Sequence, residues 1–298
     1  MSLRAELVRL GLRWFIKSMS GSGTSVEAMR RQAALLGLLV PQPPRGTVVT
    51  RVELDGIEAV SIATPESLGD RHVLYLHGGG YVSGKPALYR DFTWRIAAAA
   101  RARVVIIAHR LAPEHPFPAA IEDAARAYRA LLSGGTDPRR MAVMGESAGA
   151  GLALGMLLKL RDEGSRLPAV AAAISPWTDL ALTGDSIRRN AKADPMIRGE
   201  EGPRLVSCYL AGADPRTPYA SPLYGDPTGL PPTLIQVGSD EVLLDDSVRM
   251  AERMRTAGCE VELEIWPRMP HAWHLWARVM PEARSAIERV GAFVQSKT

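Results

Sequence analysis

The 298-residue sequence predicts an α/β fold with a mostly parallel, eight-stranded sheet and helices on both faces. Two observations predict it. From about residue 45 onward, short apolar runs rich in β-branched residues alternate with helical runs, as they do when helices connect parallel strands. The chain can also bury a large core, and its hydrophobic content of 46% with 23% charged residues is typical of a globular protein.

The elements follow in order along the chain. The first two strands, separated by Asp55-Gly56, are predicted to form an antiparallel hairpin, and the later strands alternate with helices. The predicted strands are 48–54, 58–63, 72–76, 104–108, 141–144, 169–174, 233–237 and 261–265. The predicted helices are 88–100, 118–132, 147–161, 242–257 and 281–293. Residues 175–232, rich in Pro, Asp and Gly, are interpreted as an insertion over the ligand-binding edge of the sheet, within a single domain of residues 45–298.

Residues 1–44 are predicted to form a helical cap segment. The first helix is amphipathic: one face gathers Leu3, Leu7, Leu10, Trp14 and Phe15, whereas Arg4, Arg9, Arg13 and Lys17 lie elsewhere. After a break at residues 20–23, a second helical run covers 25–39. Such a basic helix could lie on a membrane surface, but we expect both helices to dock over the domain as a lid.

Composition excludes several classes of function. The net charge is +4, but the arginines are scattered and only five lysines occur, so the sequence does not predict nucleic-acid binding. No stretch reaches the roughly 20 apolar residues of a membrane span, so we expect no stable membrane insertion. Cys208 and Cys259 lack metal-binding spacing and are expected to be reduced thiols, which favours a cytoplasmic location. No cofactor or metal is expected.

A candidate nucleophile lies where the strand at 141–144 runs into a helix of small residues. Gly145-Glu146-Ser147-Ala148-Gly149 matches the G-x-S-x-G pattern in a strand-turn-helix context. In this turn the serine adopts strained backbone angles, and the flanking glycines leave room for the neighbouring strand and helix. The alternative is an ordinary strand-to-helix turn.

A glycine-rich loop, His77-Gly78-Gly79-Gly80, follows the strand at 72–76. Consecutive glycines leave backbone N–H groups uncovered, as an oxyanion hole requires. A flexible turn or a phosphate loop would also be glycine-rich, but no Gly-Lys-Ser/Thr follows here.

Asp240 and His271 each follow one of the last two strands. The chain order is therefore nucleophile, acid, histidine, which is the order in α/β-hydrolases. His271 can accept the Ser147 proton, and Asp240 can orient its imidazole. The rival acids Glu241, Asp245 and Asp246 lie in or beyond the predicted helix start, and His274 lies three residues from His271.

These residues together make the sequence resemble the bacterial hormone-sensitive lipase-like carboxylesterases of the α/β-hydrolase fold. The resemblance is carried by His77-Gly-Gly-Gly80, Arg110-Leu-Ala-Pro-Glu-His-Pro-Phe-Pro118, Gly145-Glu-Ser-Ala-Gly149, Ser221-Pro-Leu, Gly238-Ser-Asp240 and Pro270-His271. It implies a catalytic triad of Ser147, Asp240 and His271, with Gly79, Gly80 and Ala148 as oxyanion-hole donors. It also implies a cap and suggests a homodimer. Glu146 and His109 depart from the common pattern, in which Asp and Tyr are frequent.

The sequence therefore predicts a serine carboxylesterase that hydrolyses short-chain esters through an acyl-enzyme intermediate. The expected partner is a small-molecule ester substrate. We expect the lid to leave a short apolar pocket. Two alternatives remain: an amide or N-acetyl hydrolase with the same triad, and a non-catalytic small-molecule receptor on the same fold. Matched ester and amide substrates would separate the two activities, and the complete triad argues against a receptor.

Overall fold

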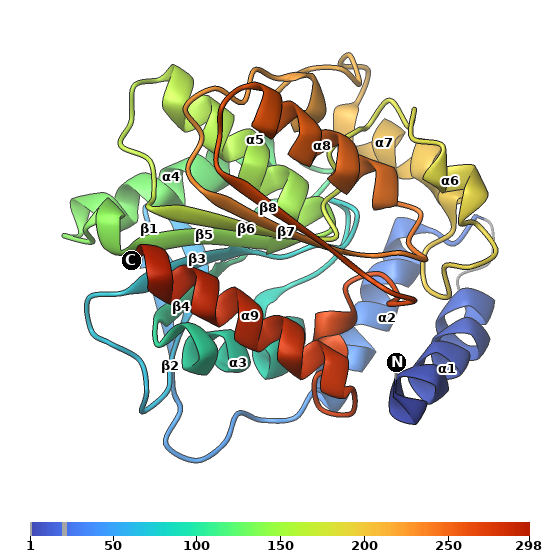
Figure 1. The fold of residues 1–298 in the computed structure, drawn as a ribbon, viewed down its shortest axis with the longest axis horizontal. Helices are drawn as coiled ribbons and strands as arrows, with labels where there is room; N and C mark the ends of the chain where they lie inside the picture. The colour runs from blue at the N-terminus through green and yellow to red at the C-terminus, as the bar shows by residue number, and fades with distance from the viewer. Residues whose placement is uncertain (1, 20–22) are drawn as a thin grey trace.

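The computed structural model describes residues 2–19 and 23–298, and in it the predicted eight-stranded, mostly parallel sheet is confirmed (Figure 1). The strand order is β1-β2-β4-β3-β5-β6-β7-β8. Strand β2 pairs antiparallel with both β1 and β4, and every other neighbouring pair is parallel. The strands are β1 (Val48–Leu54), β2 (Ile57–Ala63), β3 (His72–Leu76), β4 (Arg103–Ile107), β5 (Met141–Glu146), β6 (Val170–Ile174), β7 (Thr233–Gly238) and β8 (Val261–Trp266).

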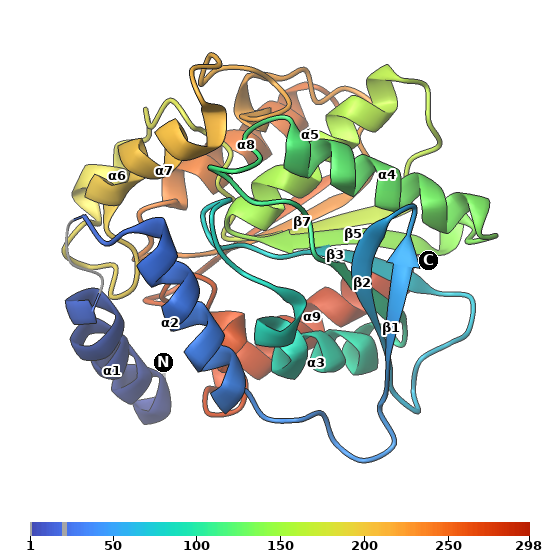
Figure 2. The ribbon, with the colours of Figure 1, turned by 180° about the vertical axis from the view of Figure 1, so that it is seen from behind.

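Helices cover both faces of the sheet. Figure 2, seen from behind, shows α4, α5 and α8 on one face and α3 and α9 on the other. The α-helices are α1 (Leu3–Met19), α2 (Val26–Leu39), α3 (Arg90–Ala100), α4 (Ala119–Ser133), α5 (Ala148–Asp162), α6 (Ser186–Arg189), α7 (Gly202–Leu210), α8 (Leu244–Thr256) and α9 (Pro281–Lys297). Each face encloses its own apolar cluster, so the sheet is buried on both sides.

Strand β5 illustrates why the sequences of the central strands are continuous apolar runs. Because successive side chains of a strand point to opposite faces, Met141 and Val143 enter the cluster under α4 and α5, whereas Ala142 and Met144 enter the cluster under α3 and α9. All four are fully buried. The strand therefore ends at the carboxyl edge of the sheet with no freedom to shift.

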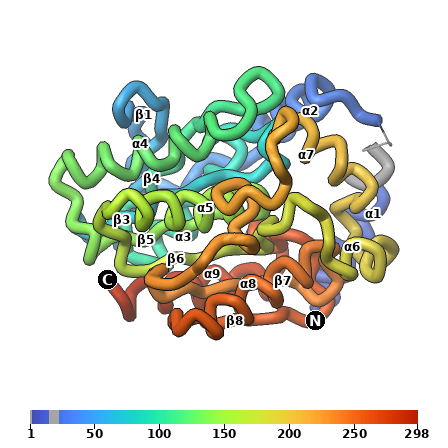
Figure 3. The backbone as a smooth tube through the Cα atoms, turned by 90° about the horizontal axis from the view of Figure 1, so that it is seen from above, coloured from blue at the N-terminus to red at the C-terminus, as the bar shows by residue number. Residues whose placement is uncertain are grey.

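The insertion at residues 175–232 and the N-terminal helices gather at one end of the molecule. Figure 3 shows α1, α2, α6 and α7 together at this end. Helix α2 is fixed by two arginines: Arg30 donates to the carbonyls of Val82 and Ala112 and pairs with Glu114, while Arg90 donates to the carbonyl of Val40 near the end of α2. None of the helices within residues 2–19 and 23–298 is long and apolar enough to cross a membrane.

Helix α1 does not dock through the apolar face that its sequence suggests. Leu3 is 78% exposed and Trp14 83% exposed, and Leu7 and Leu10 between them are also exposed. The side chains that pack inward are those of Ala5 and Leu12, which are buried. The Phe15 side chain and most of the predicted break at 20–23 lie outside the described part of the chain. Helix α1 thus contacts the domain through Ala5 and Leu12, while its other leucines remain exposed.

Helix α8 begins two residues later than predicted. Its first residue is Leu244, and the Val242 N–H donates instead to Asp194 Oδ2 of the insertion at 3.0 Å. Asp240 and Glu241 therefore lie in the connection between β7 and α8, before the helix begins. This displacement decides which carboxylate reaches the active site.

The start of α5 lies in direct contact with the end of β3. A Cβ atom at Gly149 would lie 2.2 Å from the Leu76 carbonyl oxygen, which is backbone and cannot move aside. By contrast, a Cβ at Gly37, in the last turns of α2, would meet nothing within 4 Å.

We predict that Gly149→Ala destabilises the protein by about 2 to 4 kcal/mol, because the added methyl forces β3 and α5 apart. Gly37→Ala is the matched control and should be neutral or stabilising by up to about 1 kcal/mol, since alanine is the better helix former. Thermal or urea unfolding of both variants checks this. Equal stability of the two would contradict the close approach.

Candidate active site

Ser147 occupies a strained turn between β5 and α5. Its backbone has φ 56° and ψ −126°, a left-handed region that non-glycine residues rarely adopt. The turn is held from both sides: the Ser147 N–H donates to the Ile174 carbonyl at 2.9 Å, and the Ser147 carbonyl accepts from Gly151 and Trp177, each at 3.1 Å. These bonds keep the serine at the carboxyl edge of the sheet, where its side chain lines a large cavity.

The glycines flanking Ser147 are required by space. A Cβ at Gly145 would lie 2.3 Å from the Gly149 carbonyl oxygen, and Gly149 itself faces β3. The sequence-based explanation of the two glycines, that they make room for strand and helix, is thereby confirmed.

The loop after β3 presents backbone N–H groups beside Ser147. Gly79 and Gly80 have φ values of 113° and 63°, and a Cβ at Gly79 would lie 2.2 Å from the Ser83 carbonyl oxygen. Within the described residues, the N–H groups of Gly79 and Gly80 donate to no backbone carbonyl. The Ala148 N–H lies at the first residue of α5, where helix N–H groups lack intrahelical partners. These three donors are the candidate oxyanion hole.

Glu146 holds this loop from below. Its buried carboxylate accepts a hydrogen bond from the Gly78 N–H, and a Cβ at Gly78 would collide with it. Burial raises the pKa of Glu146 to about 7, against the opposing effects of His271 and of the bonds to Gly78 and Tyr89. The departure from the common Asp at this position therefore has a structural consequence, because the longer side chain reaches the loop itself.

His271 is buried and faces the same cavity as Ser147. Its Nδ1 lies 2.8 Å from Oε2 of Glu241. The prediction that Asp240 orients this imidazole is wrong, because the Asp240 carboxylate pairs instead with Arg9 of α1 at 2.7 Å.

The Glu241 carboxylate is fully buried and well supplied with donors. Besides His271, it accepts a bond from the Ser175 hydroxyl at 2.7 Å and from the Gly238 N–H at 2.6 Å. The Ser175 hydroxyl in turn accepts from the Ala272 N–H at 3.1 Å, next to His271. Ser175 thus connects the acid to the histidine loop, a role that sequence analysis missed although Ser175 directly follows β6.

The turn after β7 explains why the second carboxylate is the one used. The Glu241 N–H donates back to the Gly238 carbonyl, so the chain reverses and the Glu241 side chain folds under the strand end, while Asp240 points outward to α1. From the insertion, Asn190 donates to the Glu241 carbonyl at 2.8 Å and Asp194 accepts from Val242. Nothing in the local sequence around Asp240 indicates these distant partners.

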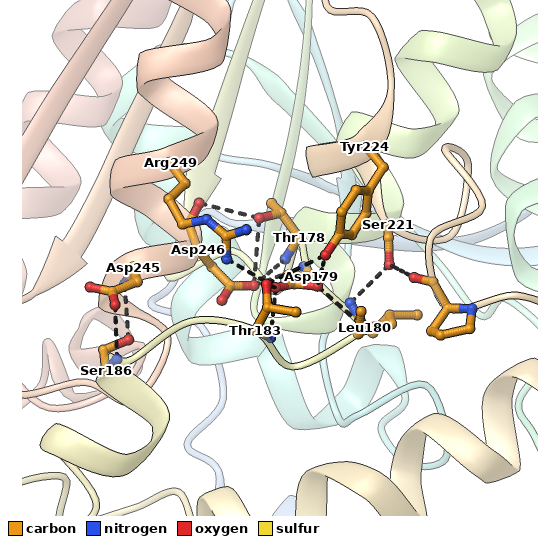
Figure 4. Close-up of polar contacts among 12 residues, drawn as sticks. Thr178, Asp179, Leu180, Thr183, Ser186, Ser221, Tyr224, Asp245, Asp246 and Arg249 are labelled. Atoms are coloured by element: carbon orange, nitrogen blue, oxygen red, sulfur yellow. Dashed lines mark hydrogen bonds and ion pairs between the residues drawn. The ribbon is translucent and has the colours of Figure 1, made fainter.

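The other rival acids serve the insertion. Figure 4 shows Asp245 against Ser186, and Asp246 beside Thr178 and Asp179. Asp245 accepts from the Ser186 N–H at 2.9 Å, and Asp246 accepts from the Thr178 and Asp179 N–H groups at 2.7 and 2.9 Å. Both carboxylates therefore hold the start of the 175–232 segment and lie away from the imidazole.

Three other histidines, His77, His109 and His274, are buried in the fold and pack against neighbouring side chains. His274 Nε2 lies 2.7 Å from Gln236 Oε1, and burial lowers the pKa of His274 to about 3. His77 stacks on His109 with ring centroids 4.3 Å apart, and burial lowers the pKa of His77 to about 3 as well. His274 and His77 are thus neutral at ordinary pH and are committed to packing.

His271 is the exception among the buried histidines. Burial disfavours its charged form, but the hydrogen bond and negative charge of Glu241, with the charges of Asp194 and Glu146, outweigh burial and raise the pKa of His271 above its ordinary value. A histidine with Nδ1 bonded to a carboxylate presents Nε2 as a proton acceptor and is stabilised once protonated. This is the arrangement of a general base.

The cavity above Ser147 has a volume of about 960 Å³ and is lined mainly by apolar side chains of α1, α2, α7 and the loop around Trp276. That is near the upper end of the range for small-molecule sites, so the expectation of a short pocket is not supported. Among the described residues, no group of three His, Cys, Asp or Glu side chains is arranged to hold a metal ion.

The chain matches the family model described as the alpha/beta hydrolase fold over residues 73–275. An acetyl-hydrolase of Streptomyces hygroscopicus is 44% identical over 295 residues, which cover 98% of this chain and 96% of that protein. An esterase of Acinetobacter venetianus is 34% identical, with 94% of this chain and 92% of that protein covered.

The chain is also similar to solved structures of esterases. An esterase from the bacterial hormone-sensitive lipase family is 39% identical with a TM-score of 0.94, covering 100% of this chain and 99% of the other. The esterase EstE5, in a crystal soaked with p-nitrophenyl butyrate, is 38% identical with a TM-score of 0.94 at the same coverage.

Replacing each of the two neighbouring carboxylates in turn should show which one supports His271. We predict that Glu241→Gln lowers kcat/KM for a p-nitrophenyl ester by about 10² to 10⁴-fold, because an amide donor favours the wrong imidazole tautomer and removes the compensating charge. Asp240→Asn, the matched control, keeps the side-chain size and should cost less than about threefold. A larger loss for Asp240→Asn would restore the original assignment.

The fall of kcat/KM on the acid side of the pH profile should reflect protonation of His271. Because the imidazole must be neutral to accept a proton and its pKa is raised, kcat/KM should fall as pH drops through an apparent pKa above the ordinary 6.5 or so. Glu146→Gln keeps an acceptor for Gly78 but removes the negative charge that Glu146 carries above its pKa of about 7, so the upper part of this acid limb should move to lower pH. An unmoved limb would contradict a contribution of Glu146.

Proposed function

This chain belongs to the α/β-hydrolase-fold family and is similar to esterases, one of them from the bacterial hormone-sensitive lipase family. We propose that it is a serine carboxylesterase with a triad of Ser147, His271 and Glu241. The observation that carries the proposal is the contact of His271 Nδ1 with a buried carboxylate, opening onto the cavity that Ser147 lines. Gly79, Gly80 and Ala148 supply the oxyanion hole.

In the acylation step, Ser147 Oγ attacks the ester carbonyl carbon while His271 Nε2 takes the hydroxyl proton. Negative charge develops on the carbonyl oxygen and is stabilised by the N–H groups of the Gly79 loop and of Ala148, with the positive end of α5 behind them. Glu241 stabilises the imidazolium without accepting the proton. When the tetrahedral intermediate collapses, His271 gives the proton to the departing alcohol.

Deacylation repeats these steps with water. His271 takes a proton from the water that attacks the acyl-enzyme, and returns it to Ser147 Oγ when the carboxylic acid leaves. Over the whole cycle one ester and one water become one alcohol and one carboxylic acid, and no atom changes its oxidation state.

We propose short-chain acyl groups as the preferred substrates. The support is indirect: one relative is an acetyl-hydrolase, and EstE5 was soaked with a butyrate ester. Since the cavity exceeds what a short acyl chain fills, the remaining space is available to a larger, apolar alcohol portion. We further propose that residues 1–44 act as a cap on the 45–298 catalytic domain, and that the protein works in the cytoplasm, where Cys208 and Cys259 remain free.

The proposal predicts that Ser147→Ala abolishes labelling by a fluorophosphonate and lowers kcat by several orders of magnitude, leaving only the contribution of binding and the oxyanion hole. Mass spectrometry of the labelled wild type should locate the adduct on Ser147. Labelling of another serine, or an active Ser147→Ala protein, would overturn it. Parallel assays with p-nitrophenyl acetate and p-nitroacetanilide test whether an amide hydrolase describes the protein better.

A further inference from the structure

The outer face of helix α1 is an apolar strip that the fold leaves in water. At about 100° per residue, Leu3, Leu7, Leu10 and Trp14 fall within roughly 60° of one another, and all four are at least half exposed. The opposite side of the same helix carries the buried Ala5 and Leu12. Among the described residues, helix α1 therefore has two apolar faces, one buried against the domain and one largely exposed.

A second group of exposed apolar side chains lies at the end of α2. Leu38 is 79% exposed and Leu39 78% exposed, and Leu35 and Leu36 are also exposed. Solvent-exposed leucines at this density on two helices at the same end of a molecule are unusual for a surface that contacts only water.

The two groups meet at the mouth of the active-site cavity. Trp14 of α1, Leu36 and Leu39 of α2, and Val279 are each exposed and at the same time line the cavity that contains Ser147. The apolar surface is thus continuous from the outside of the helices into the site. A partner lying on this surface would cover the entrance.

The charge distribution indicates what that partner is. The first forty residues contain six of the 36 basic residues and two of the 32 acidic ones, so they carry the whole net charge of +4, and the rest of the chain is balanced. Arg4 and Arg13 are exposed and flank the α1 strip on its two sides. The acidic residue of α1, Glu6, is paired with Arg268.

A second copy of the chain fits this surface poorly. In a two-fold contact through this face, Arg4 and Arg13 of both chains would flank the same apolar seam. Like charges flanking an interface oppose association. An anionic lipid layer, by contrast, accepts apolar side chains at the depth of its acyl chains and arginines at its headgroups.

We propose that the exposed faces of α1 and α2 dock this protein peripherally on anionic lipid membranes, with the mouth of the cavity against the lipid. The α1 strip and the leucines at the end of α2 enter the headgroup boundary, and Arg4 and Arg13 contact the anionic headgroups. A lipophilic ester dissolved in the membrane could then enter the cavity without crossing water. This last step rests on the proposed esterase function, whereas the docking itself does not.

The test is co-sedimentation of the full-length protein with vesicles of phosphatidylcholine alone or mixed with phosphatidylglycerol. We expect binding to the mixed vesicles, weak binding to phosphatidylcholine, and weakening of the former as salt rises from about 0.1 M to about 1 M. Failure of the wild-type protein to bind phosphatidylglycerol vesicles at low salt would overturn the proposal, whatever its esterase activity.

Two pairs of variants locate the surface. The double variant Leu7→Gln, Leu10→Gln should weaken vesicle binding by more than about tenfold, whereas Val48→Gln, Val49→Gln, which changes two exposed apolar side chains on β1, should not. Arg4→Glu should weaken binding by roughly tenfold or more, and Arg51→Glu, an equal charge reversal on β1, should weaken it much less. Equal effects within either pair would overturn the assignment.

Two controls separate docking from folding and from association. Thermal midpoints and turnover of a water-soluble ester should be unchanged in these variants, because Arg4, Leu7 and Leu10 do not line the cavity. Analytical ultracentrifugation should give a monomer. A dimer that Leu7→Gln, Leu10→Gln dissociates would show that a second copy covers this face, and would contradict docking on lipid.

Discussion

The close approach of strand β3, strand β5 and the start of α5 is the constraint on which the rest of the site depends. Gly149 touches the Leu76 carbonyl and Gly145 touches Gly149, so the turn between them has room for one backbone path, and Ser147 takes it with a φ of 56°. The glycine loop begins directly after Leu76, and the Glu146 carboxylate binds its Gly78 N–H. The proposed nucleophile and the proposed oxyanion donors are therefore positioned by the same contact, at the cost of strain at one residue.

The adjacent carboxylates Asp240 and Glu241 divide two tasks between them. Glu241 faces inward to His271, and Asp240 faces outward to Arg9 of the cap. The Arg9 and Asp240 side chains are only 12% and 19% exposed, so their ion pair is less screened than one on the open surface. Its main effect is geometric, because it joins α1 to the turn that carries Glu241, the proposed catalytic acid. The position of the cap and the position of the acid are thereby linked through consecutive residues.

Sequence alone predicts the parts of this site that depend on neighbouring residues. The eight strands, the glycine loop after β3 and the serine turn after β5 follow from local patterns, because each is fixed by apolar periodicity and by glycines at defined offsets. The acid does not follow from such a pattern. Which of Asp240 and Glu241 faces the imidazole depends on where α8 begins, and that is decided by Asp194, 48 residues earlier in the insertion. Ser175 is missed for a related reason, since its partner Glu241 comes from another strand end.

Helix α1 shows that an amphipathic pattern does not by itself identify the face of a helix that packs inward. An amphipathic helix is usually assumed to bury its more apolar face, but α1 buries Ala5 and Leu12 and leaves the larger leucines outside. Small side chains permit a closer approach to the domain than leucines would, so the packing face and the more hydrophobic face need not coincide. Among the described residues these outer leucines are about half exposed or more, and the arginines at their edges make burial in another protein costly. A surface that is apolar at its centre and cationic at its edges matches the one boundary that offers both environments within a few ångströms, the boundary between an acyl layer and its anionic headgroups.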